Sequence, residues 1–455
     1  MQQALPPGPE PRRFYNMVRW LATPLPWLDE LQAKFGNAFT MHLPRTDAPI
    51  VIFAEPSAVR DLWTGDPDTL HAGEANIILR SVLGKDSLLV LDGDRHLRER
   101  RLMLPPFHGD RMRAYGDTMR EVTAHEVERW PSGKAFSLHE STQAITLDVI
   151  MRTVFGVGSA DPRMRPLRDA LVKWTTLGTS RLGTAVLLLT PPEYADNIRQ
   201  VTERPLGRLL PWAKLVRAQL EVDRLIRDLI TARRREGTAG REDILSMLLE
   251  ARDEAGAPMT DDQLRDEMLT LLVAGHETTA TALAWTVHHL LEHPEWHDRI
   301  RAEVREVGTQ ELDKLVLLDA AIKETLRLTP ILPMVGRVLA KPATIGGVAM
   351  PRGSVALACI YLVHRRPDLW PDPLRFDPNR FVGKKADPTT YFPFGGGARR
   401  CLGMAFASYE MKIVLATILS KVDLANAPGK RIKLVRRGIT FAPSGGMPVM
   451  LARRY

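Results

Sequence analysis

A continuous helical pattern over residues 261–292 constrains the fold of this chain more than any other feature of its sequence. Thr260 and Gln263 stand at its start in the spacing of a capping box, and Pro294 follows its end. A helix of this length spans about 48 Å, at about 1.5 Å per residue, so it can cross a whole molecule. Its middle is apolar except at residues 275–279, where a glycine and adjacent threonines weaken a helix. The pattern predicts one long helix as the centre of the fold, with a candidate site at its middle.

The other periodicities predict a mainly helical protein with small β-sheets. Residues 39–43 and 50–53 have the composition of a hairpin, and the tail predicts a second hairpin, in which residues 433–441 and 447–452 flank Pro-Ser-Gly-Gly at 443–446. Because helices and strands do not alternate regularly, we expect an α+β protein rather than a doubly wound one. The further helices are expected at residues 94–103, 111–129, 139–155, 163–178, 212–235, 242–252, 295–306, 312–328 and 402–421.

The length and composition favour a single large folding unit. The chain has 455 residues, of which 44% are hydrophobic, and we find no Ser/Gly-rich linker or internal repeat. We therefore expect one domain over residues 1–455. A β-rich minor part is expected at about residues 36–60, 330–360 and 432–455, and a helical major part in the rest.

Cysteine content and charge exclude several classes of protein. Cys359 and Cys401 are too few for a disulfide framework, and no Cys/His spacing is that of a structural zinc site. The N-terminus lacks an apolar run long enough for a signal peptide or a membrane span. The net charge is +8, but basic and aromatic residues do not interleave as they do in nucleic-acid grooves. We expect a soluble, monomeric, cytoplasmic protein that binds no nucleic acid.

The stretch FGGGARRCLG, residues 394–403, surrounds Cys401 with glycines and arginines. Glycines let the backbone approach a flat or bulky group closely. The predicted helix after Cys401 would place the sulfur near a helix N-terminus, where a thiolate is stabilised. Such a thiolate suits a metal ligand or a nucleophile. Cys359, in the apolar run VALACIYLV, has the setting of an inert packing residue.

This stretch resembles the haem-binding loop of the cytochrome P450 family. Phe394, Gly397, Arg399, Cys401 and Gly403 occupy every fixed place of the family pattern. The resemblance extends from LPPGP at residue 5 almost to the C-terminus, and it implies the family fold, with the haem between the long central helix and the loop that carries the cysteine.

The resemblance also implies the contacts of a haem b. The Cys401 thiolate would bind the iron, Arg399 would pair with a propionate, Phe394 would pack near the sulfur, and Gly395 would lie against the cofactor. His96, Arg100 and Arg337 match the family's propionate-binding positions, with His96 where many relatives carry tryptophan. From the residues alone, a solvated basic face is the more common explanation for residues 95–101.

Residues 274–279, AGHETT, admit three interpretations. The zinc-protease motif is excluded because Ala280 stands where its second histidine must be. Threonines that bond back to carbonyls in a kinked, buried helix are the structural alternative. The third is that the stretch resembles the family's oxygen-activating motif, in which Thr278 would hold dioxygen with an ordered water and Glu277 would relay protons.

The segment KETLRLTP places Glu324 and Arg327 on one helix face. An isolated pair of this kind contributes only about 0.2–0.5 kcal/mol and is common. The pair nevertheless matches the family's Glu-x-x-Arg, and residues 370–381 resemble the meander that follows it. The resemblance therefore implies a buried structural network that Arg380 completes.

By the same resemblance the chain is a monooxygenase that inserts one atom of dioxygen into a lipophilic substrate such as a fatty acid, terpene, steroid or macrolide. Because no reductase sequence follows, electrons would come from a separate ferredoxin or flavodoxin and its NAD(P)H reductase. The leftover arginines near Cys401 and around residues 98–113 could form a basic docking face. A peroxide-driven peroxygenase and a non-catalytic haem sensor are the alternatives. The segment 173–191 is expected near the substrate, and the pocket itself is expected to include Ile77, Ile78, Val82, Leu83, Leu272, Val273, Ala274, Ile331, Leu332, Met334 and Met447.

Overall fold

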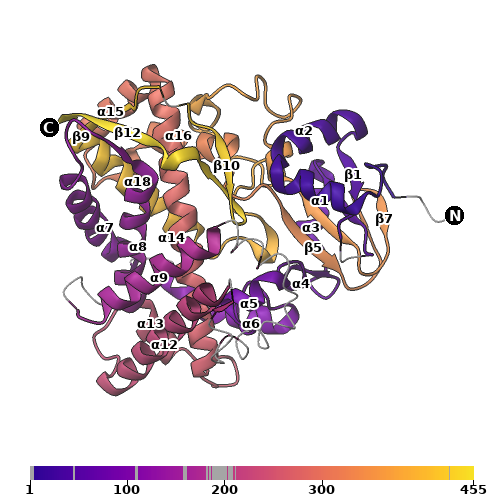
Figure 1. The fold of residues 1–455 in the computed structure, drawn as a ribbon, viewed down its shortest axis with the longest axis horizontal. Coiled ribbons are helices and arrows are strands. Elements are labelled where there is room, and N and C mark those ends of the chain that lie inside the picture. Colours follow the sequence, from indigo (N-terminus) through magenta and orange to yellow (C-terminus); the bar gives the residue numbers. More distant parts are fainter. Residues whose placement is uncertain are drawn as a thin grey trace. The chain divides into compact units, whose positions relative to one another are not determined.

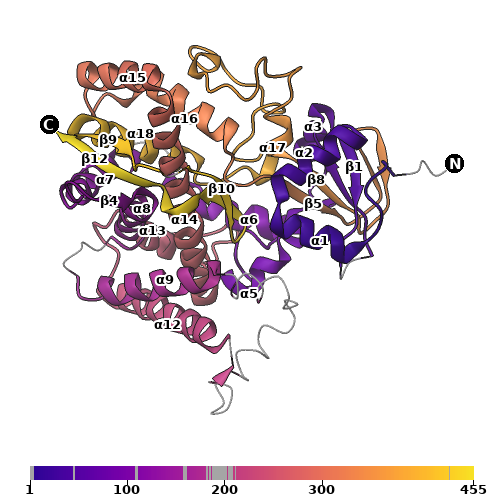
Figure 2. The ribbon, with the colours of Figure 1, turned by 45° about the horizontal axis from the view of Figure 1, so that its top comes forward.

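The chain folds into two compact units. Figures 1 and 2 show its ribbon from two directions. The computed structural model describes residues 5–44, 47–107, 111–156, 161–180, 183, 186, 202, 209–210, 212–429 and 431–455. Unit 1 consists of Met1–Asn76, Val90–Leu97 and Lys323–Cys401. Unit 2 consists of Ile77–Leu89, Arg98–Ile322 and Leu402–Tyr455.

Unit 1 is organised by a five-stranded sheet of order β1-β2-β8-β5-β3. β1 (Ala38–Met41) and β2 (Ile50–Phe53) pair antiparallel, which confirms the first predicted hairpin. All four residues of β2 are buried, because this strand lies inside the sheet and pairs in parallel with β8 (Val355–Ala358). The remaining elements of this unit are α1 (Arg13–Ala22), α2 (Pro24–Phe35), α3 (Pro56–Thr64), β3 (Leu70–His71), α4 (Ala72–Ala75), β5 (Val335–Leu339), β6 (Ala343–Ile345), β7 (Val348–Met350) and α17 (Ile360–Val363).

Unit 2 is mostly helical and is built around α14 (Asp261–Glu292), which packs against α8, α12 and α18. Figures 1 and 2 show α14 running through the middle of its unit. The helices of unit 2 are α5 (Arg80–Leu83), α7 (Arg111–Glu128), α8 (Leu138–Phe155), α9 (Met164–Thr179), α12 (Ala213–Glu236), α13 (Ile244–Glu250), α15 (Pro294–Val307) and α18 (Met404–Lys421). α6 (Gly93–Met103) and α16 (Val316–Leu328) contribute residues to both units.

The long helix begins and ends where its sequence predicts. Thr260 accepts a hydrogen bond from the backbone of Gln263, and the Gln263 side chain accepts one from the backbone of Thr260, which completes the capping box. Pro294 starts α15, so α14 stops before it. The helix continues without interruption across residues 275–279, so the glycine and threonines there do not break it.

The second predicted hairpin is wrong in its pairing. β10 (Leu434–Arg437) pairs antiparallel with β11 (Thr440–Pro443), so the turn lies at Gly438 rather than at residues 443–446. β12 (Pro448–Arg454) belongs to another sheet, in which it lies between β4 (Ala135–Ser137) and β9 (Val422–Asn426). Gly438 has a φ of 63°, which favours a tight turn at this position.

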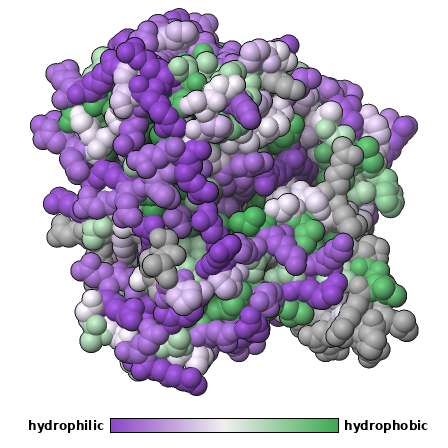
Figure 3. Space-filling view, turned by 60° about the vertical axis from the view of Figure 1, so that its left-hand side comes forward, coloured by the Kyte–Doolittle hydropathy of each residue, from purple (hydrophilic) through white to green (hydrophobic). Residues whose placement is uncertain are grey.

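Hydrophilic residues predominate on the face seen in Figure 3, where apolar residues form small separate groups. Within the described parts of the chain, we find no helix long and apolar enough to cross a membrane.

Candidate functional site

The loop that carries Cys401 is folded tightly in unit 1. The Cys401 amide donates to the carbonyl oxygen of Phe394 at 2.9 Å, which closes the loop, and the sulfur-bearing residue is exposed. Gly397 has a φ of 63°, and a Cβ atom there would lie 2.3 Å from the carbonyl oxygen of Trp63. A Cβ atom at Gly396 would lie 2.6 Å from the Trp63 ring. The close approach of Trp63 therefore requires both glycines, and the backbone angle also requires Gly397.

The guanidinium of Arg399 is anchored from one side by a carboxylate. It donates to Asp92 and to the carbonyl oxygen of Leu91. Asp92 also accepts hydrogen bonds from the amides of Gly73 and Glu74, at 2.8 and 2.9 Å. Three donors from two segments thus fix the Asp92 carboxylate, which in turn orients Arg399.

Arg337 is a buried cation in the same unit. Burial and the nearby Arg399 lower its pKa to about 10, although Asp92 acts in the opposite direction. Its guanidinium lies 5.5 Å from the centre of the Trp63 ring, which favours the charge through a cation–π interaction. An anion beside Arg337 would relieve the cost of keeping this charge out of water.

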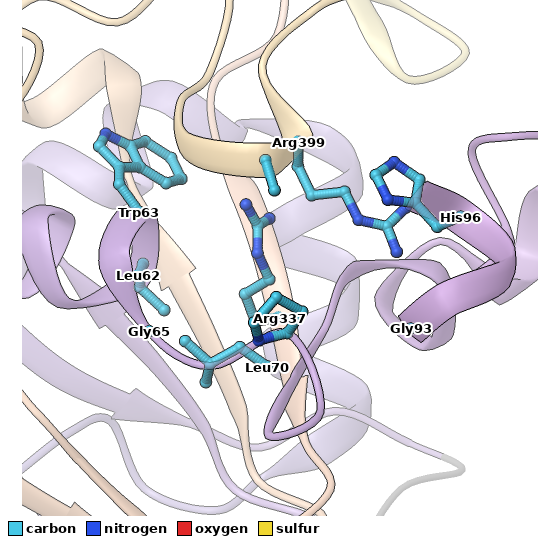
Figure 4. Close-up of a pocket in the computed structure, with 10 residues that line it drawn as sticks. Leu62, Trp63, Gly65, Leu70, Gly93, His96, Arg337 and Arg399 are labelled. Carbon is cyan, nitrogen blue, oxygen red and sulfur yellow. The ribbon is translucent and has the colours of Figure 1, made fainter. Parts of the chain in front are cut away.

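One pocket of unit 1 is lined by three of the predicted propionate-binding residues, His96, Arg337 and Arg399. In Figure 4 the Arg399 side chain extends toward the buried His96, and the Arg337 guanidinium points toward the turn that carries Arg399. Arg100, the fourth predicted residue, lies in unit 2 and does not line this pocket. Two guanidinium groups and an imidazole form a donor set that fits the two carboxylates of a haem, and the glycine loop offers the close backbone approach that a flat ring needs.

Glu324, Arg327 and Arg380 meet in one buried network of unit 1. Arg327 donates to both oxygens of Glu324, at 2.7 and 2.8 Å, and both side chains are fully buried. Arg380 lies 3.3 Å from Glu324. The remaining donors of Arg327 reach the carbonyl oxygens of His364, Pro373 and Arg375, so the network ties α16 to the meander.

The candidate residues of α14 face different surroundings within unit 2. Thr278 is half-buried and donates to the carbonyl oxygen of Ala274 at 2.6 Å, which is the bonding pattern of the structural alternative. Glu277 accepts a hydrogen bond from Gln143 of α8 at 2.5 Å, and its other carboxylate oxygen lies 3.3 Å from Arg437. These side-chain contacts therefore do not distinguish the structural alternative from the oxygen-activating motif.

The predicted pocket residues are divided between the two units, and their common pocket stays a prediction. The segment 173–191 is described only as far as residue 180, with residues 183 and 186, so its remainder lies outside the described residues. In unit 2, Leu83, Leu272 and Met447 are buried, Ile78, Val82 and Val273 are half-buried, and Ile77 and Ala274 are exposed; in unit 1, Ile331 is buried, and Leu332 and Met334 are half-buried.

Four residues of these sites were not identified from the sequence. Trp63 and Asp92 shape the loop and its arginine, and Gln143 and Arg437 contact Glu277. Asp92 follows an apolar run and precedes Gly93, but that pattern is common to many turns. The positions of these four residues in the sequence do not indicate their roles, because each contacts a residue far away in the chain.

Known proteins resemble this chain over almost its full length. The family profile described as "Cytochrome P450" matches residues 6–448. The Mycobacterium tuberculosis protein named "Putative cytochrome P450 135B1" is 40% identical over 94% of this chain and 88% of its own length. "Putative cytochrome P450 138" of the same species is 36% identical over 99% and 97%.

Solved structures have the same fold. "Retinoic acid bound cyanobacterial CYP120A1" superposes with a TM-score of 0.84 at 26% identity and covers 99% of both chains. The "cytochrome P450DA heme domain" reaches 0.83 at 24% identity, over 100% of this chain and 99% of its own, which supports the fold alone. By profile, relatives and fold, the chain belongs to the cytochrome P450 family, the haem b oxidoreductases that use dioxygen as co-substrate.

Proposed function

We propose that this monooxygenase inserts one atom of dioxygen into a lipophilic substrate and receives its electrons from a separate ferredoxin or flavodoxin. The donor set of His96, Arg337 and Arg399 is the observation that carries the proposal, because it suits the carboxylates of a haem. Cys401 would supply the thiolate that holds the haem iron, and Arg100 would complete the propionate contacts. Bound haem supplies the iron at which dioxygen is activated.

The residues of α14 would handle the protons. Thr278 gives its hydroxyl hydrogen to the Ala274 carbonyl, so its oxygen can accept a hydrogen bond from a water or from a protonated oxygen. Glu277, the residue before it, has an ionisable carboxylate that two side chains contact. We assign Thr278 to holding dioxygen and water, and Glu277 to passing protons to them.

A lipophilic substrate is supported by the aliphatic character of the predicted lining residues and by the retinoic acid in the similar cyanobacterial protein. The substrate class can be measured as a shift of the ferric absorbance spectrum to the high-spin form. We expect one class among fatty acids, terpenes, steroids and macrolides to produce it. The absence of a shift with every class would contradict the lipophilic assignment.

An acidic redox partner is supported by the net charge of +8. Some of the arginines expected on the basic face are already neutralised, since Arg98 pairs with Asp253 and Arg101 with Glu254. Arg113 and Arg400, also in the expected region, are exposed. The docking face is proposed from the charge of these residues and of the chain.

The proton-handling role is tested by Thr278→Ala, with Thr278→Ser as the matched variant that keeps the hydroxyl. We expect Thr278→Ala to divert electrons from product to hydrogen peroxide, while Thr278→Ser stays close to the wild type. The measurement is product and peroxide formed per NAD(P)H consumed. Unchanged coupling in Thr278→Ala would contradict the role and would favour the peroxygenase or sensor alternatives.

A further inference from the structure

The carboxylate of Glu277 is held from two directions within unit 2. Gln143 of α8 donates to one oxygen at 2.5 Å. Arg437, the last residue of β10, places its Nε atom 3.3 Å from the other oxygen. The Glu277 side chain keeps only 15% of its exposure and Arg437 keeps 30%, so the pair is partly shielded from water. The hydrogen bond from Gln143 orients one oxygen, and the other, which has no hydrogen-bond partner among the described residues, is held by the ion pair with Arg437.

A buried histidine joins this cluster and its protonation can be worked out. His139 is 1% exposed, and its Nε2 atom lies 3.0 Å from the Thr281 hydroxyl. Thr281 gives its own hydrogen to the Glu277 carbonyl at 2.8 Å, so its oxygen must accept from His139. The Nδ1 atom then presents a lone pair to Arg437, at 3.5 Å. The contacts therefore require the neutral Nε2–H tautomer.

Arg437 differs from the other residues of the cluster in its charge. Burial lowers the pKa of His139 to about 4 and also lowers the pKa of His276, so both imidazoles are neutral near pH 7. Among the described groups that face Glu277, Arg437 is thus the cation that balances the carboxylate. The other contacts, from Gln143 and His139, are neutral.

Because proton delivery by Glu277 is itself part of the proposed function, the following step rests on it. We propose that Arg437 is a positioning residue for this monooxygenase: through its ion pair with Glu277 it fixes the orientation from which the carboxylate exchanges protons. Gln143 holds the other carboxylate oxygen of Glu277. His139 contacts both the Arg437 guanidinium and the Thr281 hydroxyl, and so fixes their relative positions. The arginine itself touches neither the cofactor nor the substrate in this role.

The test compares Arg437→Gln, Glu277→Gln and the double variant in the holoenzyme, with Arg436→Gln as the matched control. Arg436 lies on the same strand, and its guanidinium donates to the Gly438 carbonyl instead. We expect Arg437→Gln to raise the peroxide formed per electron pair about 2- to 5-fold, the range for a partly exposed ion pair. Substrate affinity should not change, and Arg437→Lys should restore part of the coupling.

The double variant separates positioning from general damage. If Arg437 acts through Glu277, then Arg437→Gln adds no further peroxide in the Glu277→Gln background. The melting temperatures give a readout independent of turnover, since the two substitutions should be non-additive, whereas Arg436→Gln and Glu277→Gln should add.

Two kinds of result would overturn the inference, and only one of them would also overturn the proposed proton role of Glu277. If Glu277→Gln raises peroxide but Arg437→Gln does not, or if their effects add, the positioning role fails and the function of Glu277 stands. If Glu277→Gln leaves the peroxide yield unchanged, the proposed proton role of Glu277 fails, and the inference fails with it.

Discussion

At the scale of the residue, buried titratable groups of this chain are neutral where their hydrogen bonds demand it. His364 is completely buried, and its Nε2 atom accepts a hydrogen bond from the Phe392 amide at 3.0 Å. Burial, and then the nearby Arg327, lower its pKa to about 3. Protonation would therefore place a second positive charge beside Arg327 and break the bond to Phe392.

This histidine should make a defined contribution to the pH dependence of stability. The imidazole binds a proton below about pH 6.5 in the unfolded chain but only near pH 3 in the folded protein. Its stabilising effect is thus complete above pH 6.5 and is lost as the pH falls toward 3. We expect the loss in free energy of unfolding caused by His364→Gln to shrink by about 1.4 kcal/mol per pH unit below pH 6.5.

The measurement is urea unfolding of both proteins from pH 7.5 to pH 5. His125→Gln, which removes an exposed histidine, is the control for the change in composition. A difference between wild type and His364→Gln that stays constant over this pH range would contradict the assignment.

Individual site residues could be predicted from the sequence where their role is local. The spacing around Cys401 and Arg399 is a property of one short loop, so a single stretch of residues was enough. Asp92, Trp63 and Arg437 act across long separations in the chain, and their chemistry is ordinary for turns and surfaces. Only the folded chain brings them to their partners.

At the scale of the element, a backbone angle and the space beside Trp63 both limit which residues the loop before Cys401 can accept. Alanine at Gly397 would have a φ of 63° and a Cβ atom in conflict with the Trp63 carbonyl. Gly383 has a similar φ, of 65°, but open space around it. Gly383→Ala therefore carries the cost of the backbone angle alone, about 1–2 kcal/mol.

We expect Gly397→Ala to lower the free energy of unfolding by more than Gly383→Ala does, because the loop or Trp63 must also move. The haem content per polypeptide should fall in Gly397→Ala and stay normal in Gly383→Ala. Equal haem content and equal stability in the two variants would show that the close approach of Trp63 is unimportant.

For the network between α16 and the meander at residues 370–381, we expect a larger loss of stability than for the glycine substitutions. Glu324→Ala or Arg327→Ala leaves a fully buried charge without its partner, which costs about 3–5 kcal/mol. We expect insoluble or haem-free protein from both variants. Asp368→Asn removes one partner of the Arg366–Asp368 pair, whose carboxylate is 59% exposed, and should behave like the wild type. Normal solubility and haem content in Glu324→Ala and Arg327→Ala would contradict this account.

Elements were predictable where apolar periodicity reports burial directly. The capping box and the apolar middle located α14 to the residue. Helix α1 was not predicted, and its faces explain why: it buries Asn16, which donates to two carbonyl groups, and exposes Phe14, Tyr15 and Val18. The second hairpin was misassigned because β11 and β12 are adjacent in sequence but pair with different strands, a choice that depends on tertiary contacts.

At the scale of the whole molecule, the two units divide the predicted chemistry. The cysteine loop and the residues His96, Arg337 and Arg399 belong to unit 1, whereas Thr278 and Glu277 belong to unit 2. The proposed function assigns the first set to holding the haem and the second to handling protons. The central claim is therefore that Cys401 is the ligand that makes this haem a monooxygenase centre.

The most direct test of this claim is the absorbance spectrum of the reduced protein with carbon monoxide. Cys359 provides the control, because it is fully buried with its pKa raised to about 12 by burial, and it cannot supply a thiolate near neutral pH. We expect wild type and Cys359→Ala to show the thiolate-type band, and Cys401→Ser to lose it even when haem is bound. A thiolate-type band that persists in Cys401→Ser would contradict the account.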